Sequence, residues 1–293
     1  MHICQCRTYQ QIKGSIPNQG RAQPSNYLHY DDTNLLIDVG DGTARQLGKA
    51  GVSLGAIDVI FISHLHFDHT GGLFAFLGQR YQTSNFSPLT IYGPPGIKRT
   101  VVGLFAAMRP MSESGDQLAN VANQAPDFNI EIIELSGGEQ VAIGQIEVLN
   151  IVNSHYILSD PTGARSQSLS FRFDLPDRSI VYSGDTGPSK ALENLAEGVD
   201  LLICEIMMPQ KSLNSIRVTR PDVPERALSA IMNHFQRQHV SPEEAGLIAK
   251  RSAVKKLVLT HNAIADQFID EAGKVIAKHY EGPVSFAEDL DSF

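Results

Sequence analysis

Cysteine is scarce in this chain of 293 residues, which contains only Cys4, Cys6 and Cys204. An odd number of thiols, two of them in one N-terminal Cys-Gln-Cys segment, provides no disulfide framework. We therefore expect the protein to reside in a reducing compartment. The pair of Cys4 and Cys6 is assigned no role.

Long apolar runs are absent as well. No stretch of the sequence approaches the roughly 18 consecutive apolar residues that a membrane-spanning helix needs. The N-terminal segment MHICQCRTYQQIKG also lacks the basic start and apolar core of a secretory signal. We expect no membrane partner and a cytoplasmic location, with a periplasmic one left open if a signal peptide was removed.

Positive charge is not in excess either, since 24 Lys and Arg residues stand against 32 Asp and Glu residues, for a net charge of −8. An acidic surface attracts a polyanion poorly, so nucleic acid is not expected as a partner, although net charge does not report on a local basic patch. The chain also has no internal repeat and no low-complexity linker. These absences favour a single domain over residues 1–293.

Apolar runs of strand length alternate with helical patterns, which is typical of an α/β protein. Strands are predicted at 35–39, 57–64, 89–92, 129–135, 145–155, 168–176, 178–185, 199–206 and 254–261. Helices are predicted after the Gly-Asp-Gly turn at 40–42, from about Pro95, and from Ser241, which precedes a proline and two glutamates. Two long excursions, 109–128 and 207–238, interrupt this rhythm and have the length of lids or binding loops.

Four predicted strands end on a residue that can bind a metal ion. These residues are His64, His155, Asp185 and His261. Rigid strand ends can hold ligands to the tolerance that a metal ion demands.

The segment FISHLHFDHTGG adds three further ligands directly after the first of these strands. Alternation along an extended chain places His64 and His66 on one side, whereas Asp68 and His69 follow as the chain turns. One ion needs three or four ligands, so this short motif cannot complete a site alone. Two sites that share the motif use every residue: His64, His66 and His155 in one, Asp68, His69 and His261 in the other, with Asp185 between them.

The ordered set H-x-H-x-D-H, a strand-end histidine, SGDT and LTH resembles the metallo-β-lactamase-fold hydrolase superfamily over nearly the whole chain. The resemblance implies a four-layer αββα sandwich with a binuclear metal site along one edge. It implies two zinc ions, because imidazole-rich sites with a bridging carboxylate suit zinc, with manganese or iron as alternatives.

The C-terminal third is similar to ribonuclease Z and to arylsulfatase-like and phosphodiesterase-like hydrolases of this superfamily. LLICEIMM resembles their strand that ends in a glutamate, here Glu205, and HVSPEEAGLIAKRSAVKKLVLTH resembles their motif histidine, here His239, with the helix and strand after it. Two features depart from that pattern: Pro242 stands where a threonine is expected, and no long arm follows His155. Because that arm grips tRNA in ribonuclease Z, efficient tRNA processing is not expected.

The resemblance implies a zinc-dependent hydrolase that uses hydroxide held between two metal ions to cleave a small ester, namely a phosphodiester, an aryl sulfate or a lactone. The alternatives are a ribonuclease Z-like tRNA 3′ endonuclease and a non-enzymatic interaction protein on the same scaffold. Asp68 would orient the hydroxide, His239 would protonate the leaving oxygen, and Glu205 would hold His239. His29, His234 and His279 are interpreted as surface or packing residues, and a homodimer is left open.

Overall fold

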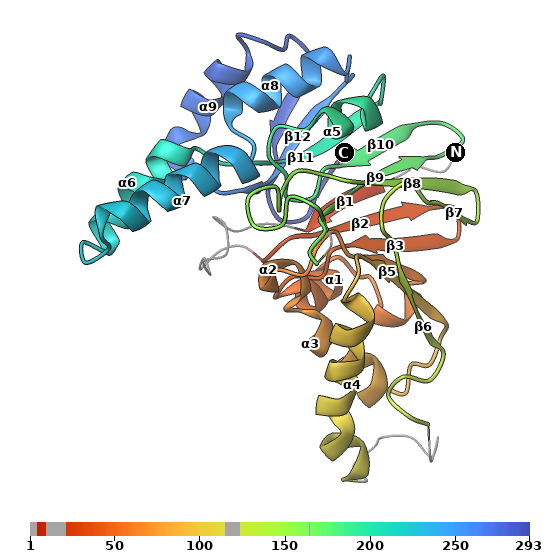
Figure 1. Ribbon diagram of the computed structural model, residues 1–293. Coiled ribbons are helices and arrows are strands. Elements are labelled where there is room, and N and C mark those ends of the chain that lie inside the picture. The colour runs from red at the N-terminus through yellow and green to blue at the C-terminus, as the bar shows by residue number, and fades with distance from the viewer. Residues whose placement is uncertain (1–4, 10–21, 115–123, 164) are drawn as a thin grey trace. The chain divides into compact units, whose positions relative to one another are not determined.

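Two mixed β-sheets organise the chain, and helices pack against one face of each sheet (Figure 1). The structure is a computed structural model that describes residues 5–9 as backbone and residues 22–114, 124–163 and 165–293 with side chains. The chain forms two compact units, the first extending to Leu135 and including Glu288–Phe293, the second extending from Ser136 to Ala287. The side chains of Cys4 and Cys6 and residues 115–123 of the first excursion lie outside the described parts.

The sheet of the first unit is parallel on the side that carries the ligand motif. Its strands, in spatial order, are β14 (Asp291–Ser292), β1 (Gln5–Tyr9), β2 (Ser25–Tyr30), β3 (Thr33–Ile37), β4 (Val59–Phe61), β5 (Leu89–Gly93) and β6 (Ile130–Glu134). Strands β3 to β6 run parallel, whereas β14, β1 and β2 pair antiparallel. The residues that follow β3 and β4 therefore emerge at the same edge of the sheet.

Helices cover one face of this first sheet. They are α1 (Thr43–Lys49), α2 (Phe67–Thr70), α3 (Leu73–Gln82) and α4 (Ile97–Glu113), with a 3₁₀ turn at Leu54–Ala56. Leu36, Ile60 and Ile91 from the strands form one buried cluster with Phe76 and Val101 from α3 and α4. Burial of apolar surface stabilises the folded state by roughly 25 cal/mol per Å². This packing holds the strands, and with them their ends, in place.

The sheet of the second unit has a matching design. Its strands, in spatial order, are β13 (Val284–Phe286), β12 (Leu257–Asn262), β11 (Leu201–Ile206), β10 (Ser179–Tyr182), β9 (Leu169–Asp174), β8 (Ile146–Val152) and β7 (Gln140–Ile143). Strands β10 to β13 are parallel, and β7 to β10 pair antiparallel. The carboxyl ends of β8, β10, β11 and β12 thus meet at one edge.

The helices of the second unit are α5 (Lys190–Leu195), α6 (Pro209–Thr219), α7 (Glu225–Gln238), α8 (Pro242–Arg251) and α9 (Ile269–Ile276), with a 3₁₀ turn at Asp266–Phe268. Helix α8 begins as predicted, because Ser241 Oγ accepts a hydrogen bond from the backbone N–H of Glu244. The excursion at 207–238 forms the helical hairpin α6–α7 (Figure 1). In the described residues, no helix combines the length and the apolar character that crossing a bilayer requires.

Several strand predictions differ from the structure: β8 ends at Val152 and β10 at Tyr182, each three residues before the predicted end, and β1, β13 and β14 were not predicted. Strand β4 ends at Phe61 and not at His64, because side-chain bonds take over from sheet pairing: the backbone N–H of Ser63 donates to Asp38 Oδ1 at 2.7 Å. Strand β7 was not predicted, since its four residues are half exposed and alternate only briefly. His64, His155 and Asp185 each follow the end of their strand by three residues, and His261 lies within β12.

Candidate metal centre

The segment after β4, which includes α2, carries four of the predicted ligands, all within the first unit. His64 and His69 are fully buried, Asp68 is nearly so, and His66 is exposed. His64 Nε2 lies 2.9 Å from His66 Nδ1, and His69 Nε2 lies 3.9 Å from Asp68 Oδ2. The motif therefore presents two pairs of ligand atoms, although their assignment to metal ions stays a prediction.

Asp38, which the sequence reasoning did not select, orients this loop from the end of β3. Its Oδ2 accepts hydrogen bonds from His69 Nδ1 at 2.7 Å and from Ser63 Oγ at 2.8 Å. Because the carboxylate accepts both bonds, Nδ1 of His69 carries the ring proton and Nε2 keeps the lone pair that a metal ion would use. The sequence feature that could have identified Asp38 is its position directly after β3, the strand that pairs with β4.

Two glycines allow the turn after β3 to approach the ligand loop. A Cβ atom on Gly40 would lie 2.3 Å from the carbonyl oxygen of Asp68, and one on Gly72 would lie 2.1 Å from the carbonyl oxygen of Gly40. The backbone N–H of Val39 also donates to the carbonyl of His69 at 2.9 Å. The loop is thus held by the backbone as well as by Asp38.

Strand ends of the second unit carry the remaining predicted ligands and an acidic neighbour. His155 is 1%, Glu205 2%, and Asp185 and His261 each 3% exposed. His261 Nδ1 lies 3.7 Å from Asp185 Oδ1, and one ligand atom each from Asp185, Glu205 and His261 fits within 4.8 Å. Buried carboxylates this close together favour a cation or a shared proton between them.

His155 is held by the C-terminal end of α7. Its Nδ1 donates to the main-chain carbonyl of Gln238 at 2.9 Å, and the side-chain amide of Gln238 donates back to the carbonyl of His155. A carbonyl oxygen can only accept, so the ring proton of His155 sits on Nδ1 and Nε2 remains a ligand atom. This geometry meets the requirement of a metal-binding imidazole.

His239 and Glu205 form a hydrogen-bonded pair in which Glu205 is buried and His239 is partly buried. Glu205 Oε2 accepts from His239 Nδ1 at 2.8 Å, and Oε1 accepts from the backbone N–H of Thr186 at 2.6 Å. Burial raises the pKa of Glu205, while the neighbouring His239 opposes that rise and Asp185 adds to it. The contact fixes Nε2 of His239 as the outward nitrogen; its role as proton donor stays a prediction.

His234 lies beside this pair, although the sequence interpretation placed it among surface or packing residues. Its ring centroid is 5.2 Å from that of His239 and 6.4 Å from that of His155. Its Nδ1 contacts Gln238 Oε1 at 2.7 Å, and burial lowers the pKa of His234. A helical pattern alone gave no signal for this placement, because it depends on how α7 ends.

A cysteine nucleophile is excluded at the neighbouring strand position. Burial raises the pKa of Cys204 to about 12, so its thiol stays protonated and unreactive near neutral pH.

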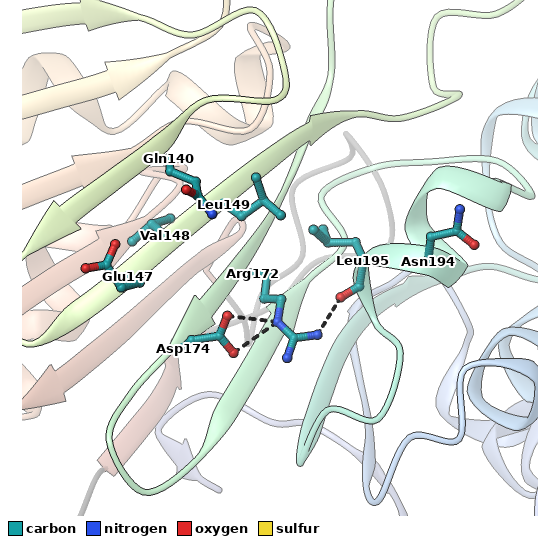
Figure 2. Close-up of a pocket in the computed structure, with 8 residues that line it drawn as sticks. All are labelled: Gln140, Glu147, Val148, Leu149, Arg172, Asp174, Asn194 and Leu195. Carbon is teal, nitrogen blue, oxygen red and sulfur yellow. Dashed lines mark hydrogen bonds and ion pairs between the residues drawn. The ribbon is translucent and has the colours of Figure 1, made fainter.

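A separate pocket of the second unit, with a volume of about 300 Å³, contains no predicted site residue (Figure 2). Arg172 in this pocket is bound by Asp174 at 3.0 Å and by the carbonyl of Leu195 at 3.0 Å. These contacts connect β9 to the end of α5. Because Arg172 is used in them, we assign no binding role to this pocket.

A family model described as a β-lactamase superfamily domain matches residues 33–262. The chain belongs to this family. The matched span includes every predicted ligand, from His64 to His261. The predicted metallo-β-lactamase fold is confirmed, with one sheet and its helices in each unit.

Relatives with known names support the ribonuclease Z branch. Ribonuclease Z of Mycobacterium avium (strain 104) is 27% identical over 281 residues, which cover 94% of this chain and 92% of that protein. Ribonuclease Z of Agathobacter rectalis is 28% identical over 298 residues, with 92% of each protein covered.

Solved structures share the fold of this metallo-β-lactamase family member. The metallo-β-lactamase fold protein YhfI from Bacillus subtilis has a TM-score of 0.69 at 18% identity and covers 99% of both chains. The short form of human tRNase Z has a TM-score of 0.62 at 21% identity, covering 96% of this chain and 95% of that chain.

The protein is thus a metal-dependent hydrolase that acts on ester bonds, and the alternative of a non-enzymatic scaffold is not supported. The arylsulfatase-like part of the predicted resemblance finds no support in these proteins. The expectation that excluded nucleic acid conflicts with relatives named ribonuclease Z. Its physical flaw is that a net charge of −8 averages over the surface and does not describe a local patch.

Proposed function

We propose that the predicted ligands of the two units together bind two divalent metal ions, with zinc as the first choice and manganese or iron as alternatives. One ion would be bound by His64, His66 and His155, the other by Asp68, His69 and His261, with Asp185 shared. Two observations support this donor set: His69 and His155 each direct a ring N–H to a fixed oxygen, which leaves Nε2 for a metal. Imidazoles with few carboxylates suit zinc.

Two such ions supply Lewis-acid chemistry, because they lower the pKa of water and offset the negative charge that develops on the ester. The chain itself supplies orientation and proton transfer. Asp68 would accept a hydrogen bond from the attacking water at a carboxylate oxygen, which directs the water toward the ester. His239 delivers a proton from Nε2 to the leaving oxygen, while Glu205 holds Nδ1 of that ring.

The proposed substrate is a phosphodiester bond of RNA, as in a ribonuclease Z-like endonuclease. The observation that carries this proposal is the similarity to proteins named ribonuclease Z over nearly their full length, 94% of this chain and 92% of the Mycobacterium avium protein. Similarity of that extent leaves little room for a large substrate-binding part that those relatives have and this chain lacks. It weakens the objection drawn from the short segment after His155.

The hairpin α6–α7 gives this acidic chain a basic segment. Residues 209–238 contain Lys211, Arg217, Arg220, Arg226 and Arg237 but only two acidic residues, in a chain of net charge −8. Arg217 and Arg220 pair with acidic residues within the hairpin, whereas Arg226 and Arg237 are exposed. Basic side chains of this kind can contact phosphates of an RNA backbone.

Hydrolysis of a small phosphodiester is the second candidate. The loop between β8 and β9 is short and closed on itself, since Asp160 accepts from the backbone N–H groups of Arg165 and Ser166 at 2.6 and 2.9 Å. A closed loop at this position provides no extended arm for tRNA.

One experiment separates the candidates. Zinc-loaded and manganese-loaded protein is assayed on bis(p-nitrophenyl) phosphate and on a 3′-extended tRNA precursor at physiological salt. We expect hydrolysis of both, with cleavage of the precursor at one defined 3′ position. Hydrolysis of the small diester alone would favour the second candidate, and no hydrolysis of either would contradict both.

A further inference from the structure

A chain of hydrogen bonds connects His234 to His155 through Gln238. The carbonyl oxygen of His155 can only accept a hydrogen bond, so the side-chain atom of Gln238 that faces it must be the donor Nε2. Oε1 of Gln238 then faces Nδ1 of His234, 2.7 Å away, and that nitrogen must donate. The main-chain carbonyl of Gln238 in turn accepts from Nδ1 of His155 at 2.9 Å.

We propose that His234 is a positioning residue for His155: it holds the Gln238 amide in the orientation that clamps His155, and thereby sets the affinity of the metal site. This inference rests on the proposed function, because His155 is one of its proposed metal ligands. It adds to that function a residue outside the H-x-H-x-D-H motif and outside the His239–Glu205 pair.

The hydrogen bond from His234 fixes the orientation of the Gln238 side-chain amide. Rotating the amide by half a turn would place Oε1 against the carbonyl oxygen of His155, two acceptors facing each other. Gln238 is only 5% exposed, so an Oε1 atom that lost His234 would be left without that bond in a buried position, at a cost that favours other amide rotamers. Each of those rotamers loosens the carbonyl of His155 and with it the ring.

The position of these residues on α7 strengthens the argument. Leu228 and Gln238 are the buried residues of this helix, so Gln238 is one of two places where α7 is anchored. The hydrogen bonds among His234, Gln238 and His155 therefore connect the end of the α6–α7 hairpin to a proposed ligand histidine. The hairpin is a supporting part of the site as well as a basic surface.

Zinc affinity of the full chain, measured by competition with a chromophoric chelator, tests the proposal. His234→Ala should lower the affinity for the zinc ion that His155 binds by about tenfold. This is the lower end of the effect expected for a group that supports a metal ligand. His234→Asn should restore most of the affinity, because Asn Nδ2 occupies nearly the place of His Nδ1 and can donate to Gln238. His279→Ala, which removes a histidine near Glu243, is the matched control and should leave zinc affinity unchanged.

A second readout does not depend on metal. The ring ¹⁵N shifts of His155 in metal-free protein should show one tautomer, protonated at Nδ1, in the wild type and in His234→Asn, and a mixture in His234→Ala. Unchanged zinc affinity together with an unchanged tautomer in His234→Ala would overturn the inference, as would equal losses in the Ala and Asn variants. A wild type that binds no metal but shows the tautomer difference would defeat the proposed metal site and leave the positioning intact.

Discussion

Three imidazoles of the site each donate one ring N–H to a fixed oxygen. His69 donates to Asp38, His155 to the carbonyl of Gln238, and His239 to Glu205. Each bond sets the tautomer and turns Nε2 outward. At the scale of the residue, the orientation of these three imidazoles is thus set by Asp38, Gln238 and Glu205, none of which is a proposed metal ligand.

Asp68→Ala should lower kcat/KM on bis(p-nitrophenyl) phosphate by about 10²-fold or more, because it removes the group that orients water. The same change should reduce the metal content, since Asp68 is a proposed ligand. Steady-state kinetics and elemental analysis of the same sample check both effects. Near-normal turnover with full metal content would be inconsistent with either role.

His239→Ala should keep its metal ions but slow substrates with poor leaving groups much more than nitrophenyl esters. A nitrophenolate leaves without a proton, whereas an alkoxide needs one, and general acid catalysis is typically worth about 10²–10⁴-fold. Rates on bis(p-nitrophenyl) phosphate and on an RNA dinucleotide measure the contrast. Equal losses on both substrates would show that His239 stabilises charge or structure and does not donate the proton.

At the scale of the element, α8 connects His239 to the core. Ser241→Ala removes the bond that caps this helix and should cost about 1 kcal/mol of unfolding free energy. Ser229→Ala, on the exposed side of α7, is the control and should change stability by less than about 0.5 kcal/mol. Denaturant unfolding of the two variants gives the comparison, and equal changes would argue against the cap.

Asp200 joins the start of β10 to the segment before β12, since it accepts from Ser179 and Lys255. These bonds lower the pKa of Asp200 to about 2 from an ordinary value of 3.8. A lowered pKa in the folded state means that the stabilisation is present above pH 3.8 and is lost as the pH falls through about 2. After allowance for solvent screening, Asp200→Asn should cost about 1 kcal/mol at pH 7.

Unfolding measured from pH 7 to pH 2 checks this expectation. The stability difference between Asp200→Asn and the wild type should shrink as the pH falls. A difference that stays constant over the whole range would mean that the Asp200 carboxylate contributes no charge-dependent stability.

Sequence patterns located the buried strands because such strands leave continuous apolar runs, although β4, β8 and β10 end three residues before the predicted positions. They missed Asp38 and Gln238, which support ligands across the sheet edge and have no fixed spacing from them. They also missed the nature of 207–238, a segment whose length was interpreted as a lid or binding loop but which forms α6 and α7, helices that bury few residues. The contact of His234 with Gln238 depends on how α7 ends and had no signal in the sequence.

At the scale of the whole molecule, the proposed function needs both units. The first unit supplies the H-x-H-x-D-H loop, and the second supplies His155, Asp185 and His261. The family match spans both sets, and neither set alone offers enough ligands for two ions. The single domain over 1–293, the cytoplasmic location and the homodimer stay predictions.

The metal content of the purified, metal-replete protein tests the central claim most directly. Elemental analysis by plasma mass spectrometry, normalised to protein concentration, should give about two divalent ions per chain, since a tetrahedral ion takes four ligands and six side chains with a shared carboxylate exceed one such site. A ratio of one ion per chain or none would contradict the account.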